Sequence, residues 1–326
     1  MDPHHSSATE TAILAVLAGT PIADIAAQIR WSPARLAEAI ELYRTAGRAA
    51  LDAQPDPTGW HQVYIEFADY PTAEHAFTTH VFPSLRTATD TGAVAAWWFL
   101  RKQPCWRLRV TPGPNATVEG VAHYLAEPLD RTVAMGLTKR WWPSLYEPET
   151  TAFGGPDGVK IAHDMFHTDS AGVLDYLHAA KPESSGLLDA KVTSFLVIST
   201  LLRAAGQEWS EQGDVWARVE ANRPLPDGIP IKRVTAMTPK LQKLLAIEPT
   251  PALAAGGPLE PLAKWVSGLQ HSGRAIADAD HAGRLSLGTR TILARHILFH
   301  WNRLGFTTRQ QAIWARAARE AMLGHR

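Results

Sequence analysis

The stretch WWFLRKQPCWRLRV, residues 97–110, constrains the fold more than any other part of this sequence. Its second half alternates polar and apolar residues, which is the pattern of a strand whose side chains point to opposite faces of a sheet. Gln103 and Pro104 separate the two aromatic halves and are typical of a turn. The spacing therefore predicts a hairpin that pairs residues 96–102 with residues 105–110.

Two arginines share one face of this predicted hairpin. Arg107 and Arg109 are two residues apart and project together, whereas Trp106, Leu108 and Val110 project to the other side. A guanidinium keeps its charge and binds carboxylates through two parallel hydrogen bonds. We interpret the arginine face as a candidate anion site.

The remainder of the chain is mainly helical. WHQVYIEF, residues 60–67, alternates as a further strand, and AEHAFTTHVFPSLRTA then has helical spacing. Residues 141–159 are rich in proline and glycine and predict a loop, and nearly everything from Gly158 onward predicts helices. We expect an α+β fold, in which a modest sheet containing antiparallel strands is covered by many helices.

A small helical unit precedes this domain. Residues 10–51 are rich in alanine and read as three short helices separated by prolines, an arrangement like a helix-turn-helix. Residues 1–50 carry four arginines against five acidic residues, which disfavours DNA binding because a DNA-binding unit normally has a basic surface. Residues 54–59, QPDPTG, predict a linker, so we expect a helical unit over residues 1–55 and a main domain over 60–326.

Composition excludes several classes of protein. The 32 basic residues balance the 32 acidic residues, so no overall field would hold DNA, tRNA or an anionic membrane, and any anion site must be local. The single cysteine excludes a framework of disulfides within the chain. Neither a leader peptide nor a long apolar segment is evident, and we expect a cytoplasmic protein without a membrane span.

A second group of chemically active residues lies near the end of the chain. His296, His300 and Arg303 are spaced four and three apart, so on a helix they share one stripe. Two histidines four apart can chelate zinc, but the usual glutamate is replaced by Ile297 and no third ligand is evident, so we expect no metal. The histidines are either half-buried structural residues or, beside an arginine that lowers the pKa of an imidazole, neutral bases.

These segments together resemble a known family. WHQVYIEF, AEHAF and HVFPSL, the hairpin WWFLRKQPCWRLRV, the loop YEPETTAFGG followed by AHDMFHTDS, and the ending HILFHWNRLGFTTRQQ are similar to the C-terminal elimination domain of class I lantibiotic dehydratases. This domain also occurs as a free-standing protein of the thiopeptide-type bacteriocin biosynthesis family. The resemblance covers residues 60–322.

The resemblance implies a lyase that tailors a ribosomal precursor peptide carrying a leader. In the family, a partner protein attaches glutamate from glutamyl-tRNA to serine and threonine side chains, and the elimination domain removes the glutamate to leave dehydroalanine or dehydrobutyrine. A related activity, the pyridine-forming [4+2] cyclase of thiopeptide pathways, stays open, as does a non-catalytic peptide-binding or regulatory protein. The sequence contains no G-x-G-x-x-G or G-x-x-x-x-G-K-S/T phosphate loop, so we expect no organic cofactor, and its balanced charge predicts no direct contact with tRNA.

The same resemblance assigns expected roles to residues. Elimination needs a base for the α-proton and cations that stabilise the enolate and the departing carboxylate. We expect His300 to act as the base and three arginines to bind the anions, namely Arg107, Arg109 and Arg303. Residues expected to bind the substrate are His296, Tyr146, Glu149, Lys102 and Asn302.

Overall fold

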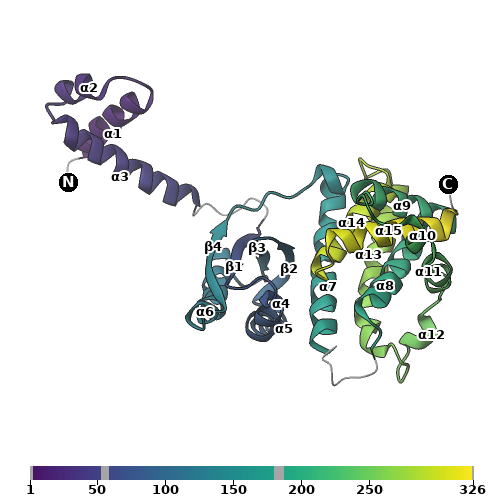
Figure 1. Ribbon diagram of the computed structural model, residues 1–326. Coiled ribbons are helices and arrows are strands. Elements are labelled where there is room, and N and C mark those ends of the chain that lie inside the picture. The colour runs from purple at the N-terminus through teal and green to yellow at the C-terminus, as the bar shows by residue number, and fades with distance from the viewer. Residues whose placement is uncertain (1–2, 53–58, 180–186, 325–326) are drawn as a thin grey trace. The chain divides into compact units, whose positions relative to one another are not determined.

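The computed structural model describes residues 3–52, 59–179 and 187–324, and the chain forms two compact units, Met1–Asp56 and Pro57–Arg326 (Figure 1). The predicted α+β class is confirmed, because helices dominate and one small antiparallel sheet lies in the second unit. The linker expected at residues 54–59 falls almost entirely outside the described residues. None of the helices in the described ranges is long and apolar enough to cross a membrane.

The first unit contains the three predicted helices. They are α1 (Pro3–Leu17), α2 (Ile22–Gln28) and α3 (Pro33–Asp52). Proline precedes α2 and begins α3, where its missing N–H removes no helical hydrogen bond. A small core of its own holds the unit together, formed by Ala12, Ile13, Ile25, Ala26, Leu36 and Ile40.

The second unit begins with the sheet. Its strands are β1 (His61–Phe67), β2 (Val94–Lys102), β3 (Cys105–Pro112) and β4 (Thr138–Ser144), in the order β2-β3-β1-β4. The predicted hairpin is confirmed as β2 and β3. The expected loop of residues 141–159 begins too early, because residues 141–144 pair with β1 as part of β4. Pro143 is tolerated there because β4 is an edge strand, where a missing N–H breaks no ladder on the open side.

One face of the sheet is apolar and covered by helices. These are α4 (Ala73–Ala76), a π-helical turn (Phe77–Val81), α5 (Phe82–Asp90) and α6 (Val118–Ala134). Phe77 of the π-helical turn packs against Phe99 and Trp106, with ring centroids 5.5 and 5.1 Å away. The opposite face carries Arg107 and Arg109, as the alternation predicts.

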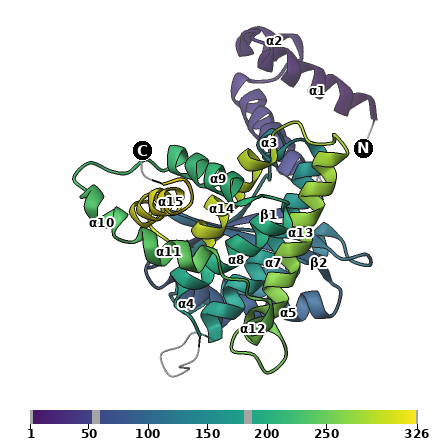
Figure 2. The same cartoon turned by 90° about the vertical axis from the view of Figure 1, so that its right-hand side faces the viewer.

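The rest of the second unit is a helical assembly, and its helix α7 (Pro156–Ala179) lies on the side of the sheet and packs on β2 (Figures 1 and 2). Large aromatic side chains fill its interior, including Phe195, Trp216 and Trp301. The other helices are α8 (Ala190–Ala204), α9 (Trp209–Asn222), α10 (Ile231–Thr235), α11 (Thr238–Leu245), α12 (Thr250–Leu253), α13 (Ala263–His281), α14 (Thr289–Arg303) and α15 (Thr308–Leu323).

Side chains from α7 and α14 cap the outer edge of β2. Asn302 of α14 accepts from the Arg101 N–H at 2.8 Å and donates to the Arg101 carbonyl at 2.6 Å. On α7, Ser170 accepts from the Phe99 N–H at 3.3 Å. An edge strand needs such partners when it is buried, because an unpaired backbone group away from water is costly. This junction brings α14 beside the arginine face of the sheet.

Candidate active site

Two buried guanidiniums approach the same indole ring. Arg109 lies directly opposite Trp98 in the β2–β3 register, and its Cζ is 4.0 Å from the Trp98 ring centroid. Arg303, at the end of α14, places its Cζ 5.9 Å from that centroid. The exposed fraction is 5% for Arg109 and 1% for Arg303. The fold thus joins two of the predicted arginines that lie far apart in the sequence.

Arg109 has no acidic partner. Among the residues that the structure describes, no carboxylate forms an ion pair with it, and its buried Nε and Nη1 have no hydrogen-bond acceptor. Burial lowers the pKa of Arg109 to about 10, so the side chain is still charged at neutral pH. A buried charge without a partner costs several kcal/mol, which an anionic ligand would offset.

Arg303, by contrast, is held by a carboxylate from α7. Its Nη1 donates to Asp169 Oδ2 at 2.9 Å, while Nε and Nη2 are buried without an acceptor. The other oxygen of Asp169 accepts from His300 Nδ1 at 2.8 Å and from Trp265 Nε1 at 3.0 Å. Asp169 therefore orients Arg303 and His300 together and leaves two guanidinium donors of Arg303 unused.

Burial opposes ionisation of Asp169, but His300 and Arg303 outweigh it and lower the pKa of this carboxyl to about 2. Asp169 was not predicted from the sequence. It lies in AHDMFHTDS, a segment that carries the family resemblance, but its charged partners His300 and Arg303 come from a helix more than a hundred residues further on.

Both ring nitrogens of His300 form hydrogen bonds with other side chains. Nε2 is 2.9 Å from Ser194 Oγ, and Trp301 Nε1 donates to the same hydroxyl at 3.0 Å. The arrangement is satisfied when Ser194 donates to Nε2 and His300 Nδ1 carries the hydrogen bound to Asp169. Only 2% of the His300 surface is exposed, and its ring centroid is 5.7 Å from that of Trp265. The expected role as base stays a prediction, and any proton would have to travel through Ser194 or Asp169.

A second histidine lies beside Arg109. His163 of α7 places Nε2 2.7 Å from the Tyr146 hydroxyl, and the Tyr146 ring centroid is 4.8 Å from the Arg109 Cζ. Burial, followed by the charge of Arg109, lowers the pKa of His163 to about 4, so the imidazole is neutral and can accept from the phenol. Gln62 holds the Leu145 carbonyl at 2.8 Å and so fixes the segment that carries Tyr146.

His296 is buried among aromatic rings one turn before His300. Its centroid is 5.0 Å from that of Phe153 and 5.6 Å from that of Phe166, and neither ring nitrogen has a partner. Burial, and after it the charge of Arg303, lowers the pKa of His296 to about 3. This neutral imidazole is available to donate or accept a hydrogen bond. No group of three metal-ligating side chains occurs within the described ranges.

The other predicted residues make contacts of their own. Arg107 is half-buried, with its Cζ 5.1 Å from the Tyr64 ring centroid. Lys102 is exposed at the end of β2, and Glu149 accepts from Arg295 at 2.8 Å in an exposed ion pair. Asn302 caps β2 with both ends of its amide. Of these, Arg107 shares the sheet face of Arg109, and so does Lys102, which pairs with Cys105 at the far end of the hairpin.

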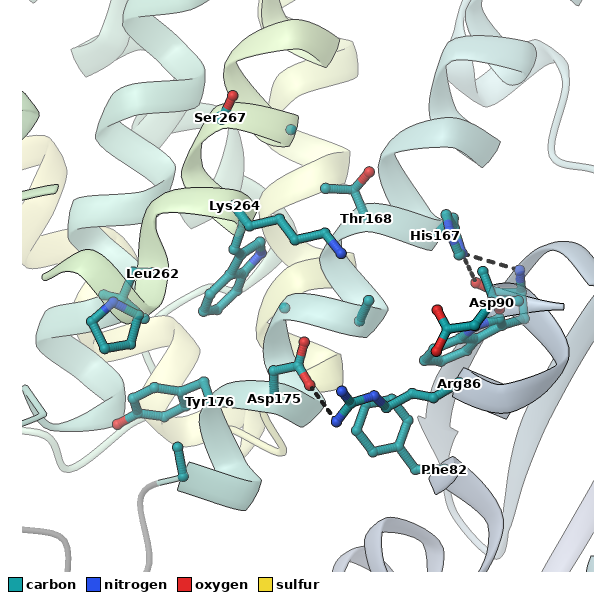
Figure 3. Close-up of a pocket in the computed structure, with 18 of the residues that line it drawn as sticks. Phe82, Arg86, Asp90, His167, Thr168, Asp175, Tyr176, Leu262, Lys264 and Ser267 are labelled. Carbon is teal, nitrogen blue, oxygen red and sulfur yellow. Dashed lines mark hydrogen bonds and ion pairs between the residues drawn. The ribbon is translucent and has the colours of Figure 1, made fainter. Parts of the chain in front are cut away.

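A cavity of about 700 Å³ lies elsewhere, between α5, α7 and α13 (Figure 3). Arg86 and Asp175 form an ion pair of 3.7 Å on one side of it, and Lys264 of α13 also lines it. Arg109, His163 and Arg303 are absent from its lining. Trp265 borders the cavity and also donates to Asp169, so this indole separates the cavity from the buried network.

Comparison with known families gives one match. The model of the family described as lantibiotic biosynthesis dehydratase C-term matches residues 60–322. No curated protein matches the chain.

Solved structures that share the fold include the following three. The tRNA-dependent lantibiotic dehydratase MibB from Microbispora sp. is 17% identical with a TM-score of 0.57; the match covers 81% of this chain but 28% of MibB. TsrL is 18% identical with a TM-score of 0.55, and 80% of this chain matches 95% of TsrL. The pyridine synthase TbtD from thiomuracin biosynthesis is 14% identical with a TM-score of 0.56, and 81% of this chain matches 97% of TbtD.

Proposed function

The chain belongs to the lantibiotic biosynthesis dehydratase C-terminal family, and from this premise we propose that it eliminates glutamate from O-glutamylated serine and threonine of a ribosomal precursor peptide. The observation that carries the proposal is the pair of buried guanidiniums at Trp98. Both have hydrogen-bond donors without an acceptor, and Arg109 has no acidic partner among the described residues. A negatively charged group placed between them would satisfy these donors. A separate glutamylating protein would supply the substrate.

The arrangement suits the charges of an elimination. Loss of the α-proton creates an enolate, and departure of glutamate creates a carboxylate, so two anions develop close together. Fixed cations at a buried site stabilise such charge more strongly than water does, because they need no reorganisation. We assign Arg109 to the enolate, Arg303 to the departing carboxylate and Arg107 to a further contact at the half-buried edge.

The test uses a synthetic peptide that bears O-glutamyl serine and follows the loss of glutamate by mass spectrometry. Wild type should produce dehydroalanine. Arg109→Lys should lower kcat by about 10² to 10³, because lysine cannot reproduce the fork of donors, while the unfolding temperature is retained. Arg140→Lys, at an exposed arginine of β4, is the matched control. Near-normal turnover of Arg109→Lys would contradict the proposal.

The pyridine-forming cyclase is the second candidate, because the pyridine synthase TbtD shares the fold. The match covers nearly all of the pyridine synthase TbtD but little more than a quarter of MibB. If wild type leaves the glutamyl ester intact yet cyclises a peptide with two dehydroalanines, the cyclase replaces the lyase. If both peptides bind unchanged, the non-catalytic peptide-binding protein is the better account.

A further inference from the structure

We propose that Tyr146 and His163 form the proton-transfer pair of this site, with Tyr146 Oη removing the Cα proton of the substrate and His163 Nε2 accepting the phenol proton. The inference rests on the proposed elimination. It names two residues from separate elements, the segment after β4 and the first turns of α7, that meet beside Arg109.

The geometry distinguishes this pair from His300. Both nitrogens of His300 are engaged, by Asp169 and Ser194, and the ring is fully enclosed. His163 is only partly buried, so its proton can reach solvent after each turnover. Two indole rings hold the His163 imidazole in place: its ring centroid lies 4.9 Å from that of Trp60 and 6.3 Å from that of Trp98.

The charges favour transfer in the required direction. Arg109 is the cation beside the pair. Burial, and after it the charge of Arg109, lowers the pKa of His163 and keeps the imidazole neutral in the resting state. When the enolate forms against Arg109, its negative charge compensates that cation, and protonation of His163 becomes less costly. In this view Asp169 and His300 act by positioning Arg303.

The step balances. Tyr146 Oη takes the Cα proton as its own proton passes to His163, and the electron pair of the C–H bond becomes the Cα=Cβ bond. The Cβ–O bond breaks, and glutamate leaves as a carboxylate facing Arg303. His163 then returns its proton to water, so no oxidant, reductant or further reactant is required.

The experiment compares Tyr146→Phe and His163→Gln with wild type on the O-glutamyl serine peptide and on the same peptide deuterated at Cα. Gln keeps an acceptor for the phenol but cannot take up a proton. Each variant should lose about 10² to 10⁴ in kcat, while the peptide dissociation constant stays unchanged. The isotope effect on kcat should rise, because proton removal limits the rate. The double variant should be no slower than the slower single variant, since both lie on one proton path.

Two control variants report on damage to the fold. Tyr124→Phe removes a hydroxyl bonded to the Ser84 carbonyl, and His167→Gln changes the histidine one turn after His163. Both should retain activity. If wild type eliminates glutamate but Tyr146→Phe and His163→Gln do so at nearly the same rate, or lose activity only through peptide binding, the pair is not the proton-transfer group. Absence of elimination by wild type would overturn the proposed function and this inference with it.

Discussion

At the scale of single residues, the site is defined by how each charge is compensated. Arg303 has Asp169 as its partner, whereas Arg109 is enclosed by Trp98 and Tyr146 and has no carboxylate among the described residues. A folded chain retains such an uncompensated cation where it binds an anion, since the same position filled by an apolar residue would cost less. We therefore propose that Arg109 binds the anion of the reaction.

Asp169 provides a prediction about stability. Asp169→Asn should lower the free energy of unfolding at pH 7 by about 3 to 5 kcal/mol, because it leaves the buried Arg303 without its counter-charge. The pKa of Asp169 in the folded state is about 2, below its ordinary value of 3.8. Its contribution is thus present above pH 3.8 and lost as pH falls towards 2. Urea unfolding between pH 7 and 2 should show this acid-dependent part in wild type and not in the variant.

Asp175→Asn is the control for that measurement, because its ion pair with Arg86 is more than half exposed. Exposed pairs contribute about 0 to 1 kcal/mol. Equal stability of Asp169→Asn and wild type at pH 7 would show that the buried network is not structurally important.

At the scale of secondary-structure elements, the junction of α7 and α14 with β2 positions the site. The helices do not pack on β2 through apolar side chains alone; they also supply hydrogen bonds to its backbone along the edge. These bonds fix the register between the end of α14 and the strand that carries Trp98. The distance between Arg303 and the arginine face is set by this register.

Asn302 contributes two of these hydrogen bonds, both to the backbone of Arg101. Asn302→Leu should lower the free energy of unfolding by about 1 to 3 kcal/mol for each backbone group left unpaired at Arg101, as measured by urea unfolding. Asn222→Leu removes an exposed hydrogen bond to the Arg218 carbonyl and should cost less than 1 kcal/mol. If Asn302→Leu instead keeps full stability and loses only peptide binding, Asn302 serves the substrate, as the family resemblance implies.

At the scale of the whole molecule, the chain is divided into units with separate cores. The core of the first unit consists of small and aliphatic residues from three helices, whereas the core of the second joins the sheet and the helical assembly. Among the described residues the two cores have no member in common. Each unit thus meets the condition for folding by itself.

Removal of residues 1–56 tests this division. The shortened chain should unfold cooperatively, and its free energy of unfolding should match that of the second unit in the full chain to within about 0.5 kcal/mol, the usual additivity of independent parts. Urea unfolding followed by tryptophan fluorescence would measure it, because most tryptophans lie in the second unit. Loss of a cooperative transition would show that the helical unit is needed to fold the larger one.

The sequence by itself determined the local geometry of this protein. A period of two residues placed Arg107 and Arg109 on one strand face, and spacings of four and three placed His296, His300 and Arg303 on one helix. These periodicities reflect the backbone geometry of strands and helices, so they can be read without a structure. The sequence pattern does not predict strand β4, because Pro143 usually indicates a loop, whereas an edge strand tolerates it.

Only the tertiary structure decided which of these faces meet. Asp169, 131 residues before His300, binds His300 and Arg303 of α14 together, and the His163 imidazole lies beside Arg109 of the arginine face. Arg109 is enclosed while Arg107 is half-exposed, although both obey the same alternation. Periodicity specifies the direction of a side chain relative to its own element. The partner across the interface depends on how the elements pack, which is determined by the burial of the whole core and not by any local pattern.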